Sequence, residues 1–305
     1  MSARMATRSH VKVPFNQWKF SWLALIIAIL CLIAATLFTY PYAAQWVTQY
    51  NQSNVIIDQE AADRLSGKIY AQEKLAAARE YNNKLHAEGI FRSGDNIMTG
   101  TGTGQESAKY EDLLNNDPNH VMARLRVPTI NLDLPVYHGT SDETLLKGVG
   151  HLKGTSLPVG GIGTRTVLTG HRGLATAELF TNLNKVKEND TFSIEVMGEV
   201  FSYRVFQVQV VAPDATEEIR AIPGKDLATL VTCTPLGINT HRILITGERI
   251  IPTPQSDLDA AGEIPSTPSF PWWIVIYLTA VLLISLWYWR SGYAPARPPK
   301  KPKRH

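Results

Sequence analysis

Two long apolar runs without a charged residue lie near the two ends of this 305-residue chain. The first covers residues 22–40 and the second covers residues 272–289. A helix needs about 20 apolar residues to cross the hydrocarbon core of a bilayer, and both runs approach that length. Tryptophan or tyrosine stands near the ends of each run, where membrane helices carry interfacial anchors. The sequence therefore predicts two transmembrane helices, over residues 21–40 and 271–289.

The charge of the chain changes sign at these two runs. Residues 1–40 contain four basic residues and no acid, and residues 271–305 contain six basic residues and no acid. All 27 acidic residues of the chain lie between the runs, with the other 20 of its 30 basic residues, so the middle part has a formal charge of −7. Basic flanks stay in the cytoplasm. We expect a cytoplasmic leader over residues 1–20, a cytoplasmic tail over residues 290–305, and an extracellular middle part.

An acidic middle part argues against nucleic-acid binding, which requires a basic face. The basic tail could instead bind nucleic acid or anionic lipid, but a cytoplasmic stop-transfer flank is the favoured interpretation. The first apolar run could also be a cleaved signal peptide. Tyr42 occupies the place where a small residue would precede Ala43 and Ala44, which favours an uncleaved anchor.

The middle part contains one cysteine, at the end of a β-branched stretch that a proline terminates. Residues 228–235 read Ala-Thr-Leu-Val-Thr-Cys-Thr-Pro, so the thiol of Cys233 is expected at the open end of a strand. A second strand begins at residue 240, after a turn of the composition Leu-Gly-Ile-Asn. Such a hairpin brings Cys233 next to Arg242, and because side chains alternate, only one of His241 and Arg242 can face the thiol.

A histidine upstream occupies a similar place. The apolar residues 166–169 end at Gly170-His171-Arg172-Gly173, which leaves the imidazole of His171 on a loop at a strand end. The only other cysteine, Cys31, lies inside the first apolar run and cannot pair with Cys233. A single unpaired thiol in an exported domain is unusual and indicates a reactive group, although a buried inert cysteine is the alternative.

These motifs resemble those of the sortase family. Residues 229–233 (Thr-Leu-Val-Thr-Cys) are similar to its cysteine signature, residues 169–171 (Thr-Gly-His) to its histidine signature, and the strand of Arg242 to its arginine segment. Their order and spacing agree over residues 122–250. The runs 134–140, 148–152 and 232–242 most resemble the class C branch, which builds pili.

This resemblance implies an eight-stranded β-barrel over residues 122–250 and an enzyme that needs no cofactor and no metal. Sortases cut a Leu-Pro-x-Thr-Gly-like sorting signal between Thr and Gly. The class C branch passes the acyl group to a lysine of a pilin subunit. The implied partners are therefore pilin or surface proteins with such C-terminal signals, an acceptor lysine amine and the membrane.

The three candidate side chains suit thiol acyl transfer. A thiolate is the attacking species, and nearby cations favour it. Cys233 is expected to attack a substrate carbonyl, Arg242 to stabilise the oxyanion or the adjacent peptide, and His171 to act as general acid and base. Arg172 is interpreted as a surface charge and not as a catalytic group. No zinc site is expected. The histidines considered for one are His138, His151 and His241, with Asp133 and Asp142 as the acids, and they form no His-x-x-x-His helix or cysteine pair.

Flanking segments complete the expected organisation. Apolar residues at helical spacing predict one or two amphipathic helices within residues 41–92, with a coiled-coil arm as the alternative. Residues 93–121 are expected to form a flexible loop. Class C sortases carry a lid here with an Asp-Pro-aromatic motif; the chain has Asp117-Pro118-Asn119 and no aromatic plug. Residues 174–183 are predicted to be a short helix, and the proline-rich residues 251–270 a semi-rigid extended linker.

Three alternative functions remain open at this point. Within the enzyme class, a housekeeping sortase would attach surface proteins to a cell-wall peptide amine instead of joining pilins. A non-enzymatic membrane scaffold would not need Cys233. A thiol-disulfide oxidoreductase is disfavoured, because residues 232–235 contain no second, resolving cysteine.

Overall fold

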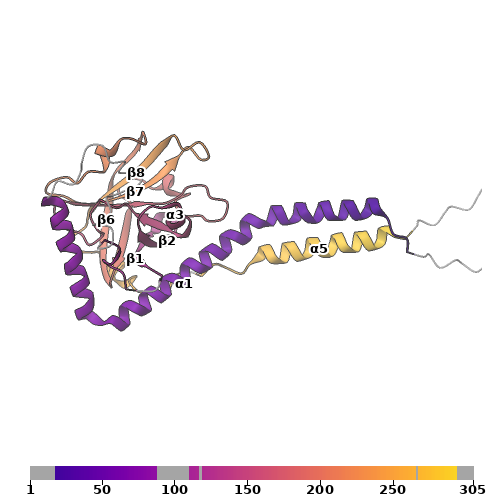
Figure 1. Cartoon of the computed structure of the whole chain (residues 1–305), viewed down its shortest axis with the longest axis horizontal. Helices are drawn as coiled ribbons and strands as arrows, with labels where there is room; N and C mark the ends of the chain where they lie inside the picture. Colours follow the sequence, from indigo (N-terminus) through magenta and orange to yellow (C-terminus); the bar gives the residue numbers. More distant parts are fainter. Residues whose placement is uncertain (1–17, 88–109, 117–118, 266, 294–305) are drawn as a thin grey trace, which may run out of the picture. The chain divides into compact units, whose positions relative to one another are not determined.

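A computed structural model of the chain describes residues 18–87, 110–116, 119–265 and 267–293. It contains two compact units, Met1–Ala43 with Pro271–His305, and Ala44–Phe270. Each unit is described by itself. The first consists of helices and the second contains a β-barrel, as Figure 1 shows.

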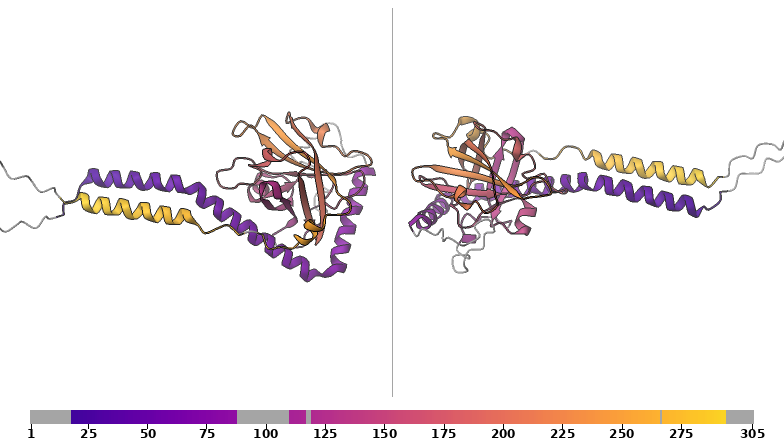
Figure 2. Two further views of the ribbon diagram at one scale, coloured as in Figure 1. Left: turned by 180° about the vertical axis from the view of Figure 1, so that it is seen from behind. Right: turned by 90° about the horizontal axis from the view of Figure 1, so that it is seen from above.

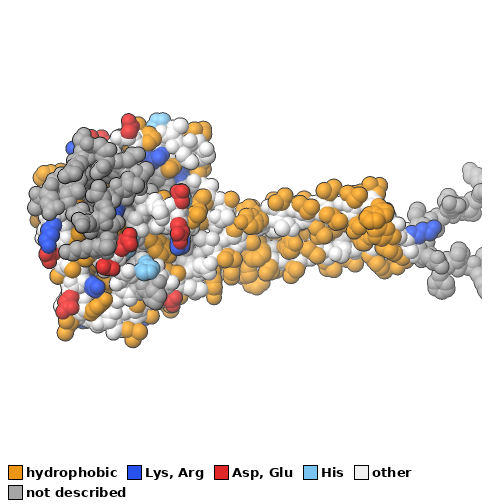
Figure 3. Space-filling view, viewed as in Figure 1, with side chains coloured by type: hydrophobic (Ala, Val, Ile, Leu, Met, Phe, Trp, Pro, Cys, Tyr) orange, Lys and Arg blue, Asp and Glu red, His pale blue; other side chains and the backbone are white. Residues whose placement is uncertain are grey.

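The first unit pairs the beginning of helix α1 (Trp22–Ala87) with helix α5 (Trp272–Ser291). The two lie side by side (Figures 1 and 2), and the hydroxyl groups of Thr36 and Tyr277 are 3.3 Å apart. Apolar side chains cover most of this pair (Figure 3). Both helices contain a segment long and apolar enough to cross a membrane, which confirms the two predicted candidate spans.

The rest of α1 belongs to the second unit and packs one of its faces on the barrel domain. Ile56, Leu75 and Ala78 are buried along this face. The helix kinks at Gly67, whose φ of 77° and ψ of 161° are not helical. A glycine adopts a positive φ without the steric cost that a Cβ atom brings. The predicted amphipathic segment is thus one kinked helix up to Ala87, and residues 88–92 lie outside the described part.

Eight strands close into a barrel in the order β1-β2-β3-β4-β7-β8-β6-β5, which confirms the predicted fold. The connections β2–β3 and β4–β7 are parallel, and the other neighbouring strands are antiparallel. The strands are β1 (Val121–Val127), β2 (Leu132–His138), β3 (Val149–His151), β4 (Thr164–Thr169), β5 (Thr191–Val196), β6 (Glu199–Val211), β7 (Asp226–Thr234) and β8 (His241–Arg249).

Alternation along the strands fills the barrel. Strand β5 alternates half-buried and buried residues without exception, as expected for a strand with one face in a core. The three buried residues of β5, namely Phe192, Ile194 and Val196, belong to one large apolar cluster. All eight strands contribute fully buried side chains to it, among them Leu125, Phe192, Ile194, Leu230 and Ile245.

Short helical turns connect the strands. Helix α3 (Asp142–Lys147) begins where the Ser141 hydroxyl accepts a hydrogen bond from the Thr144 amide. Three 3₁₀ turns are η2 (Pro128–Ile130), η3 (Leu183–Lys185) and η4 (Thr216–Ile219). The helix predicted over residues 174–183 is wrong. Leu179 has a φ of 39°, and the Phe180 amide bonds back to the carbonyl of His171 at 3.0 Å, which a helix does not permit.

The proline-rich segment after β8 also differs from the predicted extended linker. It forms helix α4 (Gln255–Asp259), and the carbonyl oxygens that follow accept hydrogen bonds from arginines of β1. Arg124 bonds the carbonyl of Glu263 at 2.7 Å and both oxygens of Asp133 at 2.7 Å, and it pairs with Glu60 of α1. Burial raises the pKa of Glu60, while the charge of Arg124 acts against that shift.

The predicted lid falls largely outside the described residues, since residues 93–109, Asp117 and Pro118 are not among them. The described portion, residues 110–116, packs against the barrel. Tyr110 and Leu114 from this portion belong to the large apolar cluster and are buried.

Candidate active site

The hairpin of β7 and β8 sets Cys233 directly opposite Arg242. Residues opposite each other in an antiparallel pair present their side chains on the same face. The neighbouring pair is Thr234 with His241, on the other face. The structure thus selects Arg242, and not His241, as the cationic neighbour of the thiol. Cys233 and Arg242 are both half-buried, and the side chain of His241 is exposed.

The face that carries Cys233 is the outer face of the barrel. Along β7, Ala228 and Leu230 point into the large core, whereas Val231 belongs to a separate small cluster. Cys233 alternates with the inward residues and shares the face of Val231. This outer cluster also contains Leu152, Val167, Ile219 and Leu244. An apolar patch, partly covered by the β6–β7 connection through Ile219, therefore leads up to the thiol.

The β7–β8 turn is fixed by hydrogen bonds at its base. The Pro235 carbonyl accepts from the amides of Ile238 and Asn239, at 3.2 and 2.9 Å. Arg242 Nη1 donates to the carbonyls of Asn239 and His241, at 3.0 Å each. The guanidinium has five N–H donors. The two groups on Nη1 hold the turn, while Nε and Nη2 have no hydrogen-bond partner among the described residues.

Strand β4 brings His171 to the same end of the barrel. It runs parallel to β7, with Thr169 registered against Val231. The pairing continues one residue further, because the Gly170 amide bonds the Val231 carbonyl at 3.1 Å and the Thr232 hydroxyl bonds the Gly170 carbonyl at 2.7 Å. His171 follows immediately and is half-buried. All three predicted site residues thus lie at the edge where β4 and β7 end and β8 begins.

The loop that carries His171 has a glycine requirement. A Cβ atom on Gly170 would lie 2.8 Å from the ring of Phe180, closer than such atoms approach in proteins. Phe180 is fully buried and bonds the His171 carbonyl through its amide. The glycine before the histidine therefore lets the loop fold tightly over the strand end.

Arg172 is more than the predicted surface charge. It is half-buried, and its Nη1 donates to the hydroxyl of Thr234 at 2.9 Å. Its Nε donates to the carbonyl of Thr181 at 3.3 Å. The sequence offered no signal for this contact beyond the position of both residues next to a candidate site residue.

Two other histidines of the barrel, His138 and His151, form a cluster with the buried Tyr110. The Tyr110 hydroxyl is 2.8 Å from His151 Nδ1, and it accepts a hydrogen bond from the Gly139 amide at 3.1 Å. His151 Nε2 is 2.9 Å from the Ser156 carbonyl. Burial lowers the pKa of His151 to about 4 and also lowers the pKa of His138. These side chains are satisfied within the fold, and the described residues contain no cluster suited to a metal ion.

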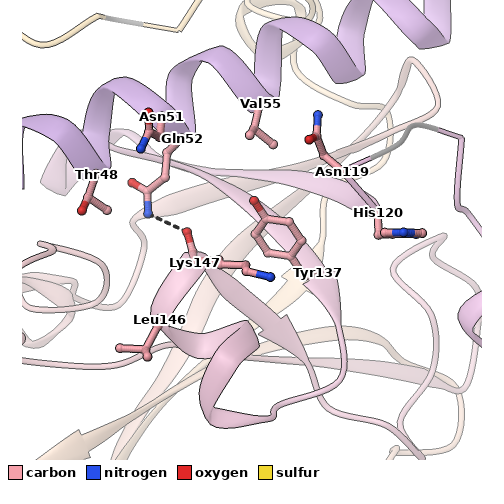
Figure 4. A pocket seen from close by; sticks show the side chains of 9 residues that line it. All are labelled: Thr48, Asn51, Gln52, Val55, Asn119, His120, Tyr137, Leu146 and Lys147. Carbon is pink, nitrogen blue, oxygen red and sulfur yellow. Dashed lines mark hydrogen bonds between the residues drawn. The ribbon is translucent and has the colours of Figure 1, made fainter.

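A cavity of about 450 Å³ lies elsewhere on the same unit, between α1 and the β2–α3 region (Figure 4). Gln52 of α1 bonds the Lys147 carbonyl at 2.9 Å across it, and Tyr137 contributes its ring. None of the three predicted site residues lines this cavity. Its volume is therefore no guide to the chemistry of Cys233.

Comparison with known proteins identifies the relatives of this domain. The sortase domain family model matches residues 125–250. Sortase C-1 from Actinomyces oris is 45% identical, with a TM-score of 0.54, and the match covers 59% of this chain and 98% of that one. Sortase C1 from Streptococcus agalactiae is 35% identical, with a TM-score of 0.59, and the match covers 66% of this chain and 100% of that one.

More distant relatives carry other sortase names. Sortase A of Bacillus anthracis is 28% identical over 134 residues, which are 44% of this chain and 62% of that protein. Sortase D of Bacillus subtilis is 28% identical over 155 residues, which are 50% of this chain and 75% of that protein. The family model, the closed barrel and the class C sortases among its structural neighbours agree: this chain belongs to the sortase family of cysteine transpeptidases.

Proposed function

We propose that this chain is a membrane-anchored transpeptidase that cleaves Leu-Pro-x-Thr-Gly-like sorting signals between Thr and Gly and joins the acyl group to a lysine of a pilin subunit. The observation that carries the proposal is the pair Cys233 and Arg242, opposite each other on the outer barrel face beside the strand end of His171. A nucleophile, a cationic donor and an acid–base group on one edge are the parts that thiol acyl transfer requires.

The first half of the reaction forms a thioester. The thiolate of Cys233 attacks the carbonyl carbon of the substrate threonine, and the carbonyl oxygen becomes an oxyanion. The guanidinium of Arg242 donates hydrogen bonds to this oxyanion from the groups that do not hold the turn. The intermediate collapses, the C–N bond to glycine breaks, and His171 donates a proton to the leaving amine.

The second half restores the enzyme. A lysine amine of the acceptor gives a proton to His171 and attacks the thioester carbon. A new amide bond forms, the C–S bond breaks, and Cys233 leaves as thiolate. No group is oxidised or reduced. The proton that His171 donates in the first half returns to it in the second half, so the enzyme ends in its starting state.

The pilin acceptor is supported by the structural neighbours. Two class C sortases are 45% and 35% identical to this chain over 98% and 100% of their own lengths. The long helical segment between the first apolar run and the barrel, and the second apolar helix after it, also fit the resemblance on which the pilin assignment rests.

We place both termini in the cytoplasm and the barrel outside the cell. The basic residues that flank both apolar runs support this orientation. Two anchors would confine the barrel to the outer membrane face, where sorting signals and acceptor amines are found.

Transfer assays with two acceptors test the proposal. The full chain in detergent micelles is incubated with a Leu-Pro-x-Thr-Gly peptide and either a pilin protein or a cell-wall peptide amine. We expect a peptide–pilin adduct, lost in a Cys233→Ala variant. Equal or better use of the cell-wall peptide would establish the alternative, a housekeeping sortase.

A further inference from the structure

We propose that Arg172 is a positioning residue that fixes the separation between the imidazole and the thiol. This inference rests on the proposed function, because it assigns a role relative to those two groups. Arg172 directly follows His171, and Thr234 directly follows Cys233. The guanidinium connects these two segments through the hydrogen bond of 2.9 Å from its Nη1 to the Thr234 hydroxyl.

The site residues lie between two cross-links of this kind. On one side, the Thr232 hydroxyl bonds the carbonyl of Gly170 at 2.7 Å. On the other side, Arg172 bonds Thr234. The imidazole-bearing and thiol-bearing residues are the single positions between these bonds on their two segments. Both ends of the gap are therefore held by side-chain contacts, although the regular β4–β7 ladder ends at Thr169.

The position of Thr234 shows that Arg172 acts indirectly. Thr234 alternates with Cys233 along β7 and pairs with the exposed His241, so its hydroxyl lies on the face opposite the thiol. In the described part of the chain, the Arg172 guanidinium has no carboxylate within 4.0 Å. Its partners are neutral oxygens, so it works by hydrogen-bond geometry.

Few other contacts hold the loop of residues 171–181 to the β7–β8 hairpin. Arg172 Nε and the Gly173 amide bond the carbonyl and hydroxyl of Thr181, at 3.3 and 3.1 Å, which closes the loop on itself. Within the residues that the structure describes, the bond to Thr234 is the one side-chain hydrogen bond from residues 171–181 to the β7–β8 hairpin. The remaining contact is packing, since a Cβ atom on Gly173 would lie 2.4 Å from Leu236.

Removal of the hydrogen bond between Arg172 and Thr234 is expected to lower kcat and to leave substrate binding nearly intact. A displacement of about 1 Å between reacting groups costs roughly 100-fold in rate. We expect Arg172→Ala to reduce kcat by about 10- to 100-fold with little change in KM. Arg172→Lys should recover part of the loss, because an ammonium can reach one oxygen but lacks the planar fork that bonds Thr181 and Thr234 together.

A double-mutant cycle in the full chain in detergent micelles tests the inference. The variants are Arg172→Ala, Thr234→Val, which keeps the shape and removes the acceptor, and the two combined. The assay measures transfer from a Leu-Pro-x-Thr-Gly peptide to an amine, with melting temperature as the folding check. We expect the double variant to lose no more kcat than Arg172→Ala alone, because both changes remove one bond. Arg204→Ala, an exposed arginine of β6, is the matched control.

Three results would overturn the inference. One is wild-type kcat in Thr234→Val, which remains decisive even if Arg172→Ala does not fold. The second is additive losses in the cycle, which would mean that the two side chains act independently. The third is a fully active Arg172→Ala. The proposed function fails separately: an active Cys233→Ala variant refutes it, whereas an inactive Cys233→Ala together with a fully active Arg172→Ala refutes only the positioning role.

Discussion

Two histidine-bearing clusters lie on one barrel and differ in their exposure. At the ends of β4, β7 and β8, His171 is half-buried near Cys233 and Arg242. At β3, His151 is fully buried, and both of its ring nitrogens have partners, one of them the Tyr110 hydroxyl. The two clusters are close in the fold, since His151 of β3 pairs with Leu168 of β4.

The difference shows that the residue types alone do not define a reactive site. The buried cluster contains two histidines and a tyrosine, yet its polar atoms are satisfied by one another and by backbone carbonyls. Such groups stabilise a fold because their hydrogen bonds are complete. The more exposed cluster consists of the half-buried His171, Cys233 and Arg242, and it keeps donors available beside a thiol that solvent can reach. The following predictions separate a catalytic role for the exposed cluster from a structural role for the buried one.

The largest effect is expected at the thiol. Cys233→Ala should reduce transpeptidation by at least about 10³-fold, because the covalent intermediate cannot form. The melting temperature should change little, since the side chain is half-buried. Cys31→Ala, in the first apolar run, is the control and should remain active. Appreciable transfer by the Cys233 variant would remove the basis for calling the exposed cluster catalytic.

A smaller effect is expected at the guanidinium. Arg242→Ala should lower kcat/KM by roughly 10²–10³-fold through loss of oxyanion stabilisation. His241→Ala should have little effect, because His241 is exposed and lies on the opposite face of β8. Steady-state kinetics on one peptide compares the two. Equal losses of kcat/KM in both variants would contradict the conclusion that Arg242, and not His241, lies on the face of the thiol.

The buried cluster should appear in the pH dependence of stability. Burial lowers the pKa of His151 from 6.5 to about 4. At pH values between these two, the unfolded chain binds a proton at this residue and the folded chain does not. The stabilisation is complete above pH 6.5 and is lost as the pH falls toward 4, by on the order of 3 kcal/mol. His138 acts in the same direction. In denaturant titrations, the free energy of unfolding of His151→Gln should fall less with decreasing pH than that of the unchanged chain. An equal dependence on pH in both would contradict this assignment.

The smallest effect is expected from one hydroxyl. Tyr110→Phe leaves His151 Nδ1 and the Gly139 amide without their partner and should destabilise the fold by about 1–3 kcal/mol. The value of kcat should not change, because the cluster takes no part in the reaction. Tyr50→Phe on the exposed side of α1 is the control. A fall in kcat at constant stability would give the buried cluster a functional role.

Local patterns in the sequence were sufficient for the hairpin that brings Cys233 next to Arg242. A β-branched strand, a turn and a second strand fix which residues meet, and alternation leaves two choices for the neighbour of the thiol. Register then decides between them in favour of Arg242. The resemblance supplied the closure of eight strands, which no single hairpin specifies.

Long-range contacts explain what the sequence did not predict. The helix expected over residues 174–183 is replaced by a loop that the buried ring of Phe180 and the positive φ of Leu179 hold in place. The extended linker expected after β8 is docked instead, because Arg124 of β1 offers donors to its carbonyls. Phe180 packs in the core that the strands of the barrel form, and Arg124 lies in β1. The deciding contacts are thus made with other parts of the chain, which local composition and periodicity do not report.

The start and the end of the catalytic unit are joined by one hydrogen bond, from the indole of Trp46 to the carbonyl of Ser269 at 2.7 Å, although these residues are 223 positions apart. Natural domains with neighbouring ends tolerate circular permutation. New termini could therefore be opened at the Met197-Gly198 turn and the old ones sealed by a short peptide bridge. A soluble, permuted version of the barrel with its reactive edge intact is thus an accessible engineering target.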